Sequence, residues 1–271
     1  MSDGTSFLFP TGTVMKMDTV GRAAGAKYEC LLFDMDDTLY PLSTGFNLAC
    51  RKNIEEFMLK YLNIEESEVP RMCLELYREY GTTMAGLKVL GYEFDNDEFH
   101  AYAHGRLPYE TLRPDPVLRN LLLSMPQRKI IFTNADKAHA LRVLKRLALE
   151  DCFEGIICFE TLNHPPLQPP VLKSPILCKP SLEAFEAAIR VANLDPKKTI
   201  FFDDSSRNIA SGKAAGLHTV IVGNSALVPG ADHALRSIHN VKEAIPEIWD
   251  GDEEQMEQLI QAASVETVVL A

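Results

Sequence analysis

The sequence contains no run of about eighteen uncharged apolar residues, so nothing in it predicts a helix that spans a membrane. Basic residues are scarce relative to acidic ones, with 27 Lys and Arg against 38 Asp and Glu. Proteins bind nucleic-acid polymers and anionic membranes through clustered Lys and Arg. The formal net charge of -11 therefore argues against both kinds of partner.

The cysteines also lack a framework, because no two of them have C-x-x-C spacing. They are Cys30, Cys50, Cys73, Cys152, Cys158 and Cys178. Disulfide scaffolds and zinc sites need clustered cysteines, so we expect reduced, mostly buried thiols. Residues 1–28 have no apolar core of a signal peptide, and we predict a soluble, cytoplasmic protein that is a monomer or a homodimer.

What the chain does contain is enough apolar material for a large core, with 46% hydrophobic residues in a length of 271. Short apolar runs alternate with helical patterns, which is typical of βαβ units. The runs are CLLFD (30–34), KIIFT (129–133), GIICF (155–159), TIFFD (199–203) and HTVIVG (218–223). We therefore predict an α/β fold with a doubly wound, Rossmann-like parallel sheet.

More than ninety residues separate the first two runs, which is too many for one crossover connection. The residues between the two runs read as helices at 45–61, 67–80, 82–90 and 95–103. We therefore predict an inserted all-helical domain. The expected organisation is a leader (1–28), a core (29–44 and 113–240), the helical insertion (45–112) and an acidic tail with a helix (241–271). The proline-rich stretch 163–180 is expected to be an extended surface loop.

Three carboxylates follow the first strand in the sequence FDMDDT. Asp34 and Asp36 are two residues apart, so they are expected to share a face while Asp37 points elsewhere. Like charges this close repel unless a cation or a proton relieves them. A plainer interpretation is a polar turn in which Asp37 caps a helix.

Three later segments carry polar side chains at comparable positions. Thr133 and Asn134 end the second strand and can cap a helix or hold a phosphate oxygen. Lys179 precedes a predicted helix, where a lone lysine is usually solvated. Asp203 and Asp204 end a fourth strand, and a second acidic strand end favours a divalent cation such as Mg²⁺.

In this order the four segments resemble the four motifs of the haloacid dehalogenase (HAD) phosphatase superfamily. The resemblance covers roughly residues 29–224, with the helical insertion in the position of that superfamily's C1 cap. Within it, the chain looks like the yeast-type pyrimidine 5′-nucleotidases. The stretches that carry this likeness are FDMDDTLYP, EYGTTMAGL, HGRLPYETLRPD, FTNADKAHA, CKPSLEAFE and FFDDSSRNI.

The resemblance implies a catalytic set and a magnesium site. Asp34 is implied to be the nucleophile and Asp36 the general acid and then base, which splits the reaction through an aspartyl-phosphate. Phosphoryl oxygens are assigned to Thr133, Asn134 and Lys179, and Mg²⁺ to Asp34, Asp36, Asp203 and Asp204. Asn208 stands where many members carry another aspartate, so we expect Asp204 to bind the metal directly, although the sequence leaves open which of the adjacent pair does.

The insertion is expected to select the substrate, because the four motifs are shared by every phosphatase of the superfamily. GTTMAGLK (81–88) nearly matches a P-loop, but Leu87 occupies the lysine position and a helix precedes it, so we reject an ATP site. Thr82 and Thr83 are predicted substrate contacts or a helix cap. His104 and Arg106 are predicted to reach the substrate or to pack at a hinge.

The resemblance therefore implies a magnesium-dependent phosphomonoesterase for UMP and CMP. The alternatives are a phosphatase for sugar or lysophospholipid phosphates, a receiver-like phosphoacceptor and a silent interaction protein. A receiver orders its acidic residues differently and has no large insertion after its first strand. A hydrolytic dehalogenase would need no Mg²⁺ and no acid at Asp36.

Overall fold

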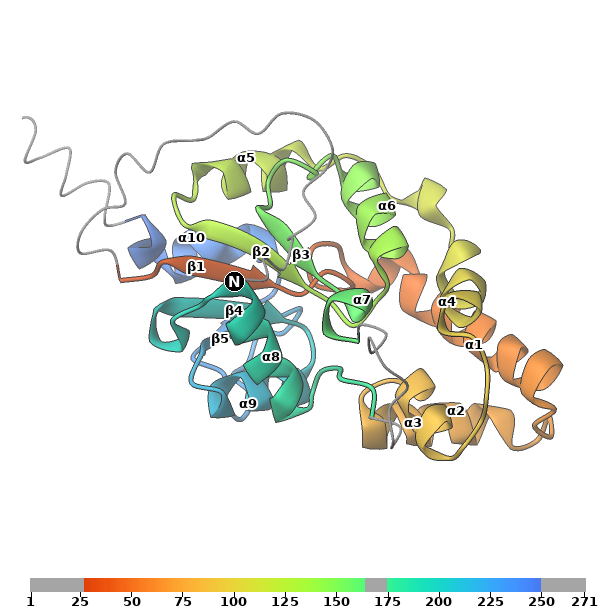
Figure 1. Cartoon of the computed structure of the whole chain (residues 1–271). Coiled ribbons are helices and arrows are strands. Elements are labelled where there is room, and N and C mark those ends of the chain that lie inside the picture. The colour runs from red at the N-terminus through yellow and green to blue at the C-terminus, as the bar shows by residue number, and fades with distance from the viewer. Residues whose placement is uncertain (1–26, 164–174, 250–271) are drawn as a thin grey trace, which may run out of the picture.

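A computed structural model describes residues 27–163 and 175–249 of the chain. Its centre is a six-stranded parallel sheet in the order β3-β2-β1-β4-β5-β6. The strands are β1 (Cys30–Phe33), β2 (Arg128–Phe132), β3 (Gly155–Ile157), β4 (Thr199–Asp203), β5 (His218–Val222) and β6 (His233–Leu235). Helices lie on both faces of the sheet, which confirms the predicted doubly wound α/β fold (Figure 1).

The central strand β1 is buried on both faces, and its side chains alternate between two hydrophobic clusters. Leu31 and Phe33 pack in one cluster, and Cys30 and Leu32 pack in the other. The covering helices are α5 (Pro116–Ser124), α6 (Lys137–Leu147), α7 (Phe159–Leu162), α8 (Leu182–Ala192), α9 (Ser206–Ala214) and α10 (Val241–Ala244). A strand covered in this way is a continuous apolar run, which is why β1 is recognisable from sequence.

Between β1 and β2 the chain leaves the sheet and forms four helices, which we call the cap. They are α1 (Phe46–Leu62), α2 (Val69–Tyr80), α3 (Thr83–Val89) and α4 (Asn96–Gly105). Each of these four helices begins and ends within two residues of the bounds predicted from the sequence. The cap has a hydrophobic cluster of its own around Phe57, Leu76 and Phe99, into which Phe159 of the core also packs.

Short 3-10 helices complete the described connections, at Leu42–Thr44, Tyr109–Thr111, Pro196–Lys198, Ile238–Asn240 and Pro246–Ile248.

Several details differ from the sequence prediction. Phe159 begins α7 instead of ending a strand, and β6 was not predicted because three residues give no recognisable apolar run. Val241, Ile245 and Ile248 were expected in the acidic tail, yet all three are buried in the core. Most of the leader (1–26), most of the proline-rich stretch (164–174) and the expected tail helix (from 250) lie outside the described residues.

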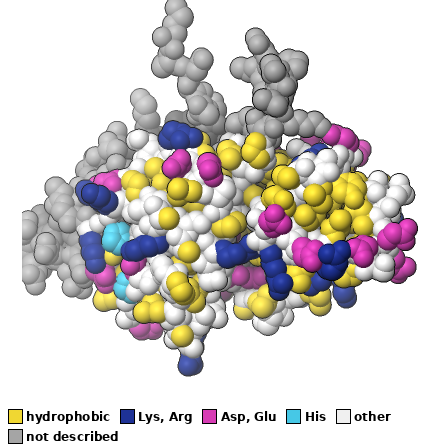
Figure 2. All heavy atoms as spheres, turned by 90° about the horizontal axis from the view of Figure 1, so that it is seen from below, with side chains coloured by type: hydrophobic (Ala, Val, Ile, Leu, Met, Phe, Trp, Pro, Cys, Tyr) yellow, Lys and Arg dark blue, Asp and Glu magenta, His cyan; other side chains and the backbone are white. Residues whose placement is uncertain are grey.

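Three further findings concern helix length, the cysteines and the charged surface. No helix among residues 27–163 and 175–249 is long and apolar enough to cross a membrane. All six cysteines are free, and all but Cys50 are buried. On the face shown in Figure 2, the Lys and Arg side chains are interspersed with Asp and Glu.

Candidate active site

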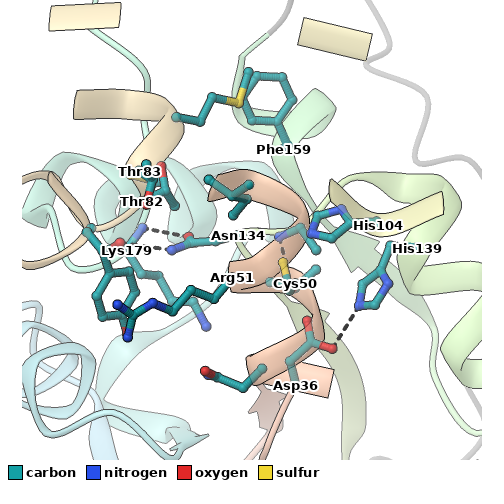
Figure 3. Close-up of a pocket in the computed structure, with 18 of the residues that line it drawn as sticks. Asp36, Cys50, Arg51, Thr82, Thr83, His104, Asn134, His139, Phe159 and Lys179 are labelled. Atoms are coloured by element: carbon teal, nitrogen blue, oxygen red, sulfur yellow. Dashed lines mark hydrogen bonds and ion pairs between the residues drawn. The ribbon is translucent and has the colours of Figure 1, made fainter. Parts of the chain in front are cut away.

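A cavity of about 350 Å³ lies at the carboxyl edge of the sheet, beneath the cap. Its core side comes from the loop after β1, the turn after β2, the segment before α8 and the turn after β4. Open α/β sheets bind ligands at this edge. Because these four segments end at the same edge, the polar side chains predicted from distant parts of the sequence meet around one cavity (Figure 3).

The floor of the cavity is a buried ion-pair network centred on Lys179. Its ammonium nitrogen lies 2.8 Å from Asp34 Oδ1 and 2.7 Å from Asp203 Oδ2, and it donates to the carbonyl of Phe132 at 2.8 Å. Lys179 is only 2% exposed. A lysine this deeply buried requires charged partners, so the interpretation of Lys179 as a solvated surface residue is wrong.

The network shifts the pKa values of its members. Burial raises the pKa of Asp34 to about 7, helped by the negative charges of Asp203 and Asp36 and opposed by Lys179. Burial alone would lower the pKa of Lys179, but Asp203 and Asp34 raise it. The lysine therefore keeps its positive charge next to a carboxyl group that titrates near neutral pH.

Three carboxylates form a group that could hold a cation. One oxygen from each of Asp34, Asp203 and Asp204 lies within 4.8 Å of the others. Asp203 is fully buried and already accepts hydrogen bonds from Lys179, the backbone of Ser205 and the amide of Asn208. The side chain of Asp204 is exposed to the cavity.

Desolvation, together with the charges of Asp34 and Asp203, raises the pKa of Asp204 to about 8. A divalent cation favours the ionised form of nearby carboxylates and would reverse such a shift. The donor set, three carboxylates on a polar floor, fits a hard oxygen-binding cation.

Asp36 does not belong to this group. Its Oδ1 lies 2.8 Å from His139 Nε2 and also accepts a hydrogen bond from Tyr40 (Figure 3). The prediction that the Asp36 side chain helps to hold the metal is therefore not reproduced. The period-two rule does not apply to these residues, because β1 ends at Phe33 and both carboxylates lie in the following loop.

The contacts of Asp36 also set its ionisation. Burial would raise the pKa of Asp36, but His139 lowers it. Burial would lower the pKa of His139, but Asp36 raises it. His139 is further oriented by the hydroxyl of Tyr109, 2.7 Å from its Nδ1. Asp36 and His139 thus behave as an ion pair that shares one proton.

Thr133 and Asn134 lie on the same floor with different roles. Thr133 is 2% exposed, and its hydroxyl accepts a hydrogen bond from the backbone of Ala135 at 3.1 Å. The amide of Asn134 both accepts from the backbone N–H of Lys179 and donates to its carbonyl, at 2.8 and 2.9 Å. Asn134 therefore positions Lys179, and its contact with a phosphate oxygen stays a prediction.

The predicted cap contacts divide into two sets. Thr82 and Thr83 line the cavity, although the Thr82 hydroxyl caps α3 through Ala85 and the Thr83 hydroxyl donates to the carbonyl of Cys73. Arg106 does not line it, because its guanidinium pairs with Glu56 at 2.7 Å on the exposed side of the cap. The prediction that Arg106 contacts the substrate is therefore wrong.

Several lining residues were not singled out from the sequence, among them Asn47, Arg51, His100, His139 and Phe159. Arg51 of α1 extends along the cavity wall in Figure 3. Asn47, Arg51 and His100 lie on helices of the cap, and only the packing of the cap against the core brings them to the cavity. His139 lies in FTNADKAHA at a fixed distance along the chain from Asn134, so the sequence did offer a signal for it.

The fold and the cavity define an α/β enzyme core with an inserted helical domain over an acidic site. Residues 28–216 match the family model of the haloacid dehalogenase-like hydrolases. The chain belongs to this family, which confirms the resemblance drawn from the four motifs at the level of the family.

Two curated relatives are similar to this chain. Phosphate metabolism protein 8 of Saccharomyces cerevisiae is 31% identical over 198 residues, a match that spans 70% of this chain and 60% of the yeast protein. Glyceraldehyde 3-phosphate phosphatase of Pyrococcus furiosus is 26% identical over 208 residues, which cover 72% of this chain and 80% of that protein.

Solved structures show the same fold at lower identity. CbbY from Rhodobacter sphaeroides, in complex with phosphate, has a TM-score of 0.53 and 16% identity over 79% of this chain and 96% of its own. The HAD hydrolase YfnB from Bacillus subtilis, bound to magnesium, has a TM-score of 0.50 and 21% identity over 80% of this chain and 98% of its own.

Proposed function

We propose that this protein is a phosphomonoesterase that depends on a divalent cation and acts through an aspartyl-phosphate on Asp34. One observation carries the proposal: two carboxylates of the same cavity have separate surroundings, Asp34 beside Lys179 and the acidic group, and Asp36 beside His139. A nucleophile and a proton carrier need this separation of tasks.

Charge compensation is the first requirement of such a reaction, because a carboxylate and a phosphate repel each other. Lys179 supplies one positive charge at Asp34. Asp34, Asp203 and Asp204 would hold Mg²⁺, with Asp204 as the more available ligand because its carboxylate is open to the cavity. When bound, the metal neutralises charge on the phosphoryl oxygens.

The chemistry then follows from the residues of the chain. An oxygen of Asp34 attacks phosphorus, and the bond from phosphorus to the ester oxygen breaks. The leaving oxygen takes the proton shared by Asp36 and His139. A water molecule next attacks the phosphoryl group and gives a proton back to Asp36, which releases inorganic phosphate and restores Asp34.

We further propose pyrimidine 5′-monophosphates, UMP and CMP, as substrates. The upper wall of the cavity supports this, because Phe46, Met84 and Phe99 of the cap and Phe159 of the core line it. The second candidate is a small phosphorylated carbohydrate. It is favoured by the names of two relatives, the Pyrococcus furiosus enzyme and the Phosphorylated carbohydrates phosphatase of Thermotoga maritima. Six free thiols favour a reducing compartment, so we also propose a cytoplasmic location.

A panel of phosphomonoesters tests both levels of the proposal. We expect hydrolysis that EDTA abolishes and Mg²⁺ restores, with higher kcat/KM for UMP and CMP than for AMP, GMP, glucose 6-phosphate or a lysophospholipid phosphate. Full activity in EDTA would contradict the metal site. A preference for purine, sugar or lipid phosphates would remove the pyrimidine assignment and leave the general phosphatase.

Thr82 tests the contribution of the cap to this preference. Thr82→Ala removes a hydroxyl that lines the cavity and caps α3, so we expect it to reduce the preference for UMP over AMP and to leave p-nitrophenyl phosphate hydrolysis largely unchanged. Thr82→Ser keeps the hydroxyl and is the matched control. Equal losses with all substrates would show that Thr82 acts only on the stability of the cap.

A further inference from the structure

His100 of α4 is a buried polar side chain that has no hydrogen-bond partner among the described residues. The residue lines the cavity but is only 7% exposed, and its Nδ1 is enclosed without a partner. An unpaired buried donor or acceptor costs about 1–3 kcal/mol. Because His100 lines the cavity, a ligand there can offer the ring a hydrogen-bond partner that the described residues do not.

The surroundings of His100 are apolar and aromatic. Its ring meets Phe159 edge to face at a centroid distance of 4.5 Å and Phe99 at 6.0 Å. Burial, helped by the positive charge that His104 can carry, lowers the pKa of His100 to about 4. The imidazole is therefore uncharged at neutral pH and can exchange hydrogen bonds only as a neutral group.

Three stacked histidine rings connect His100 to the carboxylate of Asp36. His100 stacks on His104 with a centroid distance of 5.7 Å, and His104 stacks on His139 at 4.6 Å. His139 contacts Asp36 directly. His100 is thus separated from Asp36 by two rings of the row, and we expect a small leaving group not to reach it.

The enclosed Nδ1 also indicates where the proton of the neutral ring lies. A buried N–H without an acceptor is rarer in proteins than a bare acceptor without a donor. We assign the proton to Nε2, which leaves the enclosed Nδ1 a bare acceptor and makes Nε2–H the group of the ring that can donate to a ligand. An acceptor such as a ring carbonyl oxygen would satisfy it.

We propose that His100 donates a hydrogen bond to an uncharged, planar part of the leaving group, such as the carbonyl edge of a nucleobase. This inference rests on the proposed phosphatase function and deepens it. The aromatic wall provides contact area for a flat ring, whereas a sugar has several hydroxyl groups and His100 could pair with only one of them.

The test uses the full-length protein with Mg²⁺ and compares His100→Phe with the unaltered chain. Phe keeps a ring of similar shape and removes both nitrogens. The substrates are UMP, glucose 6-phosphate and acetyl phosphate, whose small leaving group does not reach His100. His233→Phe, on β6 and outside the cavity lining, is the matched control. Thermal unfolding of each variant reports whether it is folded.

We expect His100→Phe to lower kcat/KM for UMP by about tenfold, mainly through KM, because one hydrogen bond to a neutral group is lost. Acetyl phosphate hydrolysis and the His233→Phe control should be unchanged. Partial recovery in His100→Gln, whose amide is again a donor, would support the proposal.

Three results would overturn it: unchanged kinetics with UMP, equal losses with UMP and acetyl phosphate in a folded variant, or glucose 6-phosphate as the best substrate of the unaltered protein. Failure of the proposed function looks different, because a chain without phosphatase activity would hydrolyse none of the three substrates. If UMP is not hydrolysed but acetyl phosphate is, the base-reading role of His100 is overturned while the phosphatase stands.

Discussion

Asp34 and Asp36 are separated by one residue, yet their carboxyl groups have opposite electrostatic surroundings. Asp34 lies beside two other carboxylates, and burial raises its pKa to about 7. Asp36 faces His139, which lowers the pKa of Asp36 against the effect of burial. The proton that the leaving group needs is thus held by a pair of residues and not by one carboxylic acid.

Substitution of the two carboxylates should separate their tasks. Asp34→Asn removes the attacking oxygen, and we expect roughly a thousandfold or greater loss with every substrate and no phosphoenzyme. Asp36→Asn should cost about a hundredfold or more with UMP, but much less in phosphoenzyme formation with p-nitrophenyl phosphate, whose leaving group needs no proton. Equal losses of Asp36→Asn with both substrates would argue against proton transfer by Asp36.

His100 also makes a prediction about stability. Its pKa of about 4 in the folded protein is below the ordinary value for histidine, 6.5. The unfolded chain therefore binds the proton more tightly, and folding stability falls as the pH drops from about 6.5 towards 4, by up to about 1.4 kcal/mol per pH unit. His100→Phe should remove this part of the acid sensitivity, measured by urea unfolding at several pH values. A pH dependence identical to that of the unaltered protein would contradict the burial of a neutral imidazole.

At the residue scale, sequence reasoning found the side chains that end strands and missed those that depend on the cap. Asp34, Thr133 and Asp203 follow recognisable apolar runs, and parallel strands bring such ends to one edge. His100 lies on a helix of the inserted domain, and its neighbour Phe159 is far away in the sequence. The direction of Arg106 was likewise undetermined, because Glu56 on another helix fixes it.

At the scale of elements, the cap meets the backbone of the core where α2 ends. Gly81 has φ +87, and a Cβ at this position would lie 2.2 Å from the carbonyl oxygen of Lys179. Only glycine permits this contact between the cap and the backbone that carries the buried lysine. The contact links the position of α2 and α3 to the floor of the cavity.

Gly81→Ala should therefore affect both stability and activity. The positive φ costs about 1–2 kcal/mol for a residue with a Cβ, and the clash must also displace Lys179 or the cap, so we expect a loss in kcat/KM of about tenfold or more. Gly91→Ala is the matched control, since Gly91 has φ +88 and nothing within 4 Å of its Cβ position. Similar kcat/KM values for the two variants would show that the contact is not needed for activity.

The elements themselves were predictable to the extent that their own residues determine them. Two cap helices, α3 and α4, begin at Thr82 and Asp95, whose side chains accept hydrogen bonds from the first turn. The strand β6 and the burial of Val241 depend on the rest of the fold, because a short segment becomes a sheet edge or a core contact only when a neighbour is present. Local pattern carries no such information.

At the scale of the whole molecule, Arg207 of α9 joins the core to the cap. Its guanidinium donates to the carbonyls of Tyr77 and Arg78 at 3.2 and 2.6 Å, and it lies over the Tyr77 ring at 4.7 Å. These carbonyls are at the carboxyl end of α2, where a positive charge is favoured. The arginine thereby holds the cap against the edge of the cavity.

We expect Arg207→Ala to raise KM for the best substrate of the panel several-fold, with little change in kcat and a loss of stability of about 1 kcal/mol or less. Arg236→Ala, which removes an exposed arginine after β6, serves as the control. A reduced kcat with unchanged KM would place the effect of Arg207 on the chemistry rather than on the cap.

The packing of residues 241–249 brings the two outer ends of the described fold together. Lys27, just before β1, pairs with Glu247 at 3.0 Å, on the side of the sheet opposite the carboxyl edge where substrates would enter. The first and the last segments of the described fold therefore lie side by side. A short linker could join these two positions, with new ends opened in the exposed turn at Glu65–Ser67. In the unaltered chain, attachment to a surface beside Lys27 or Glu247 would leave the cavity open to diffusing substrate.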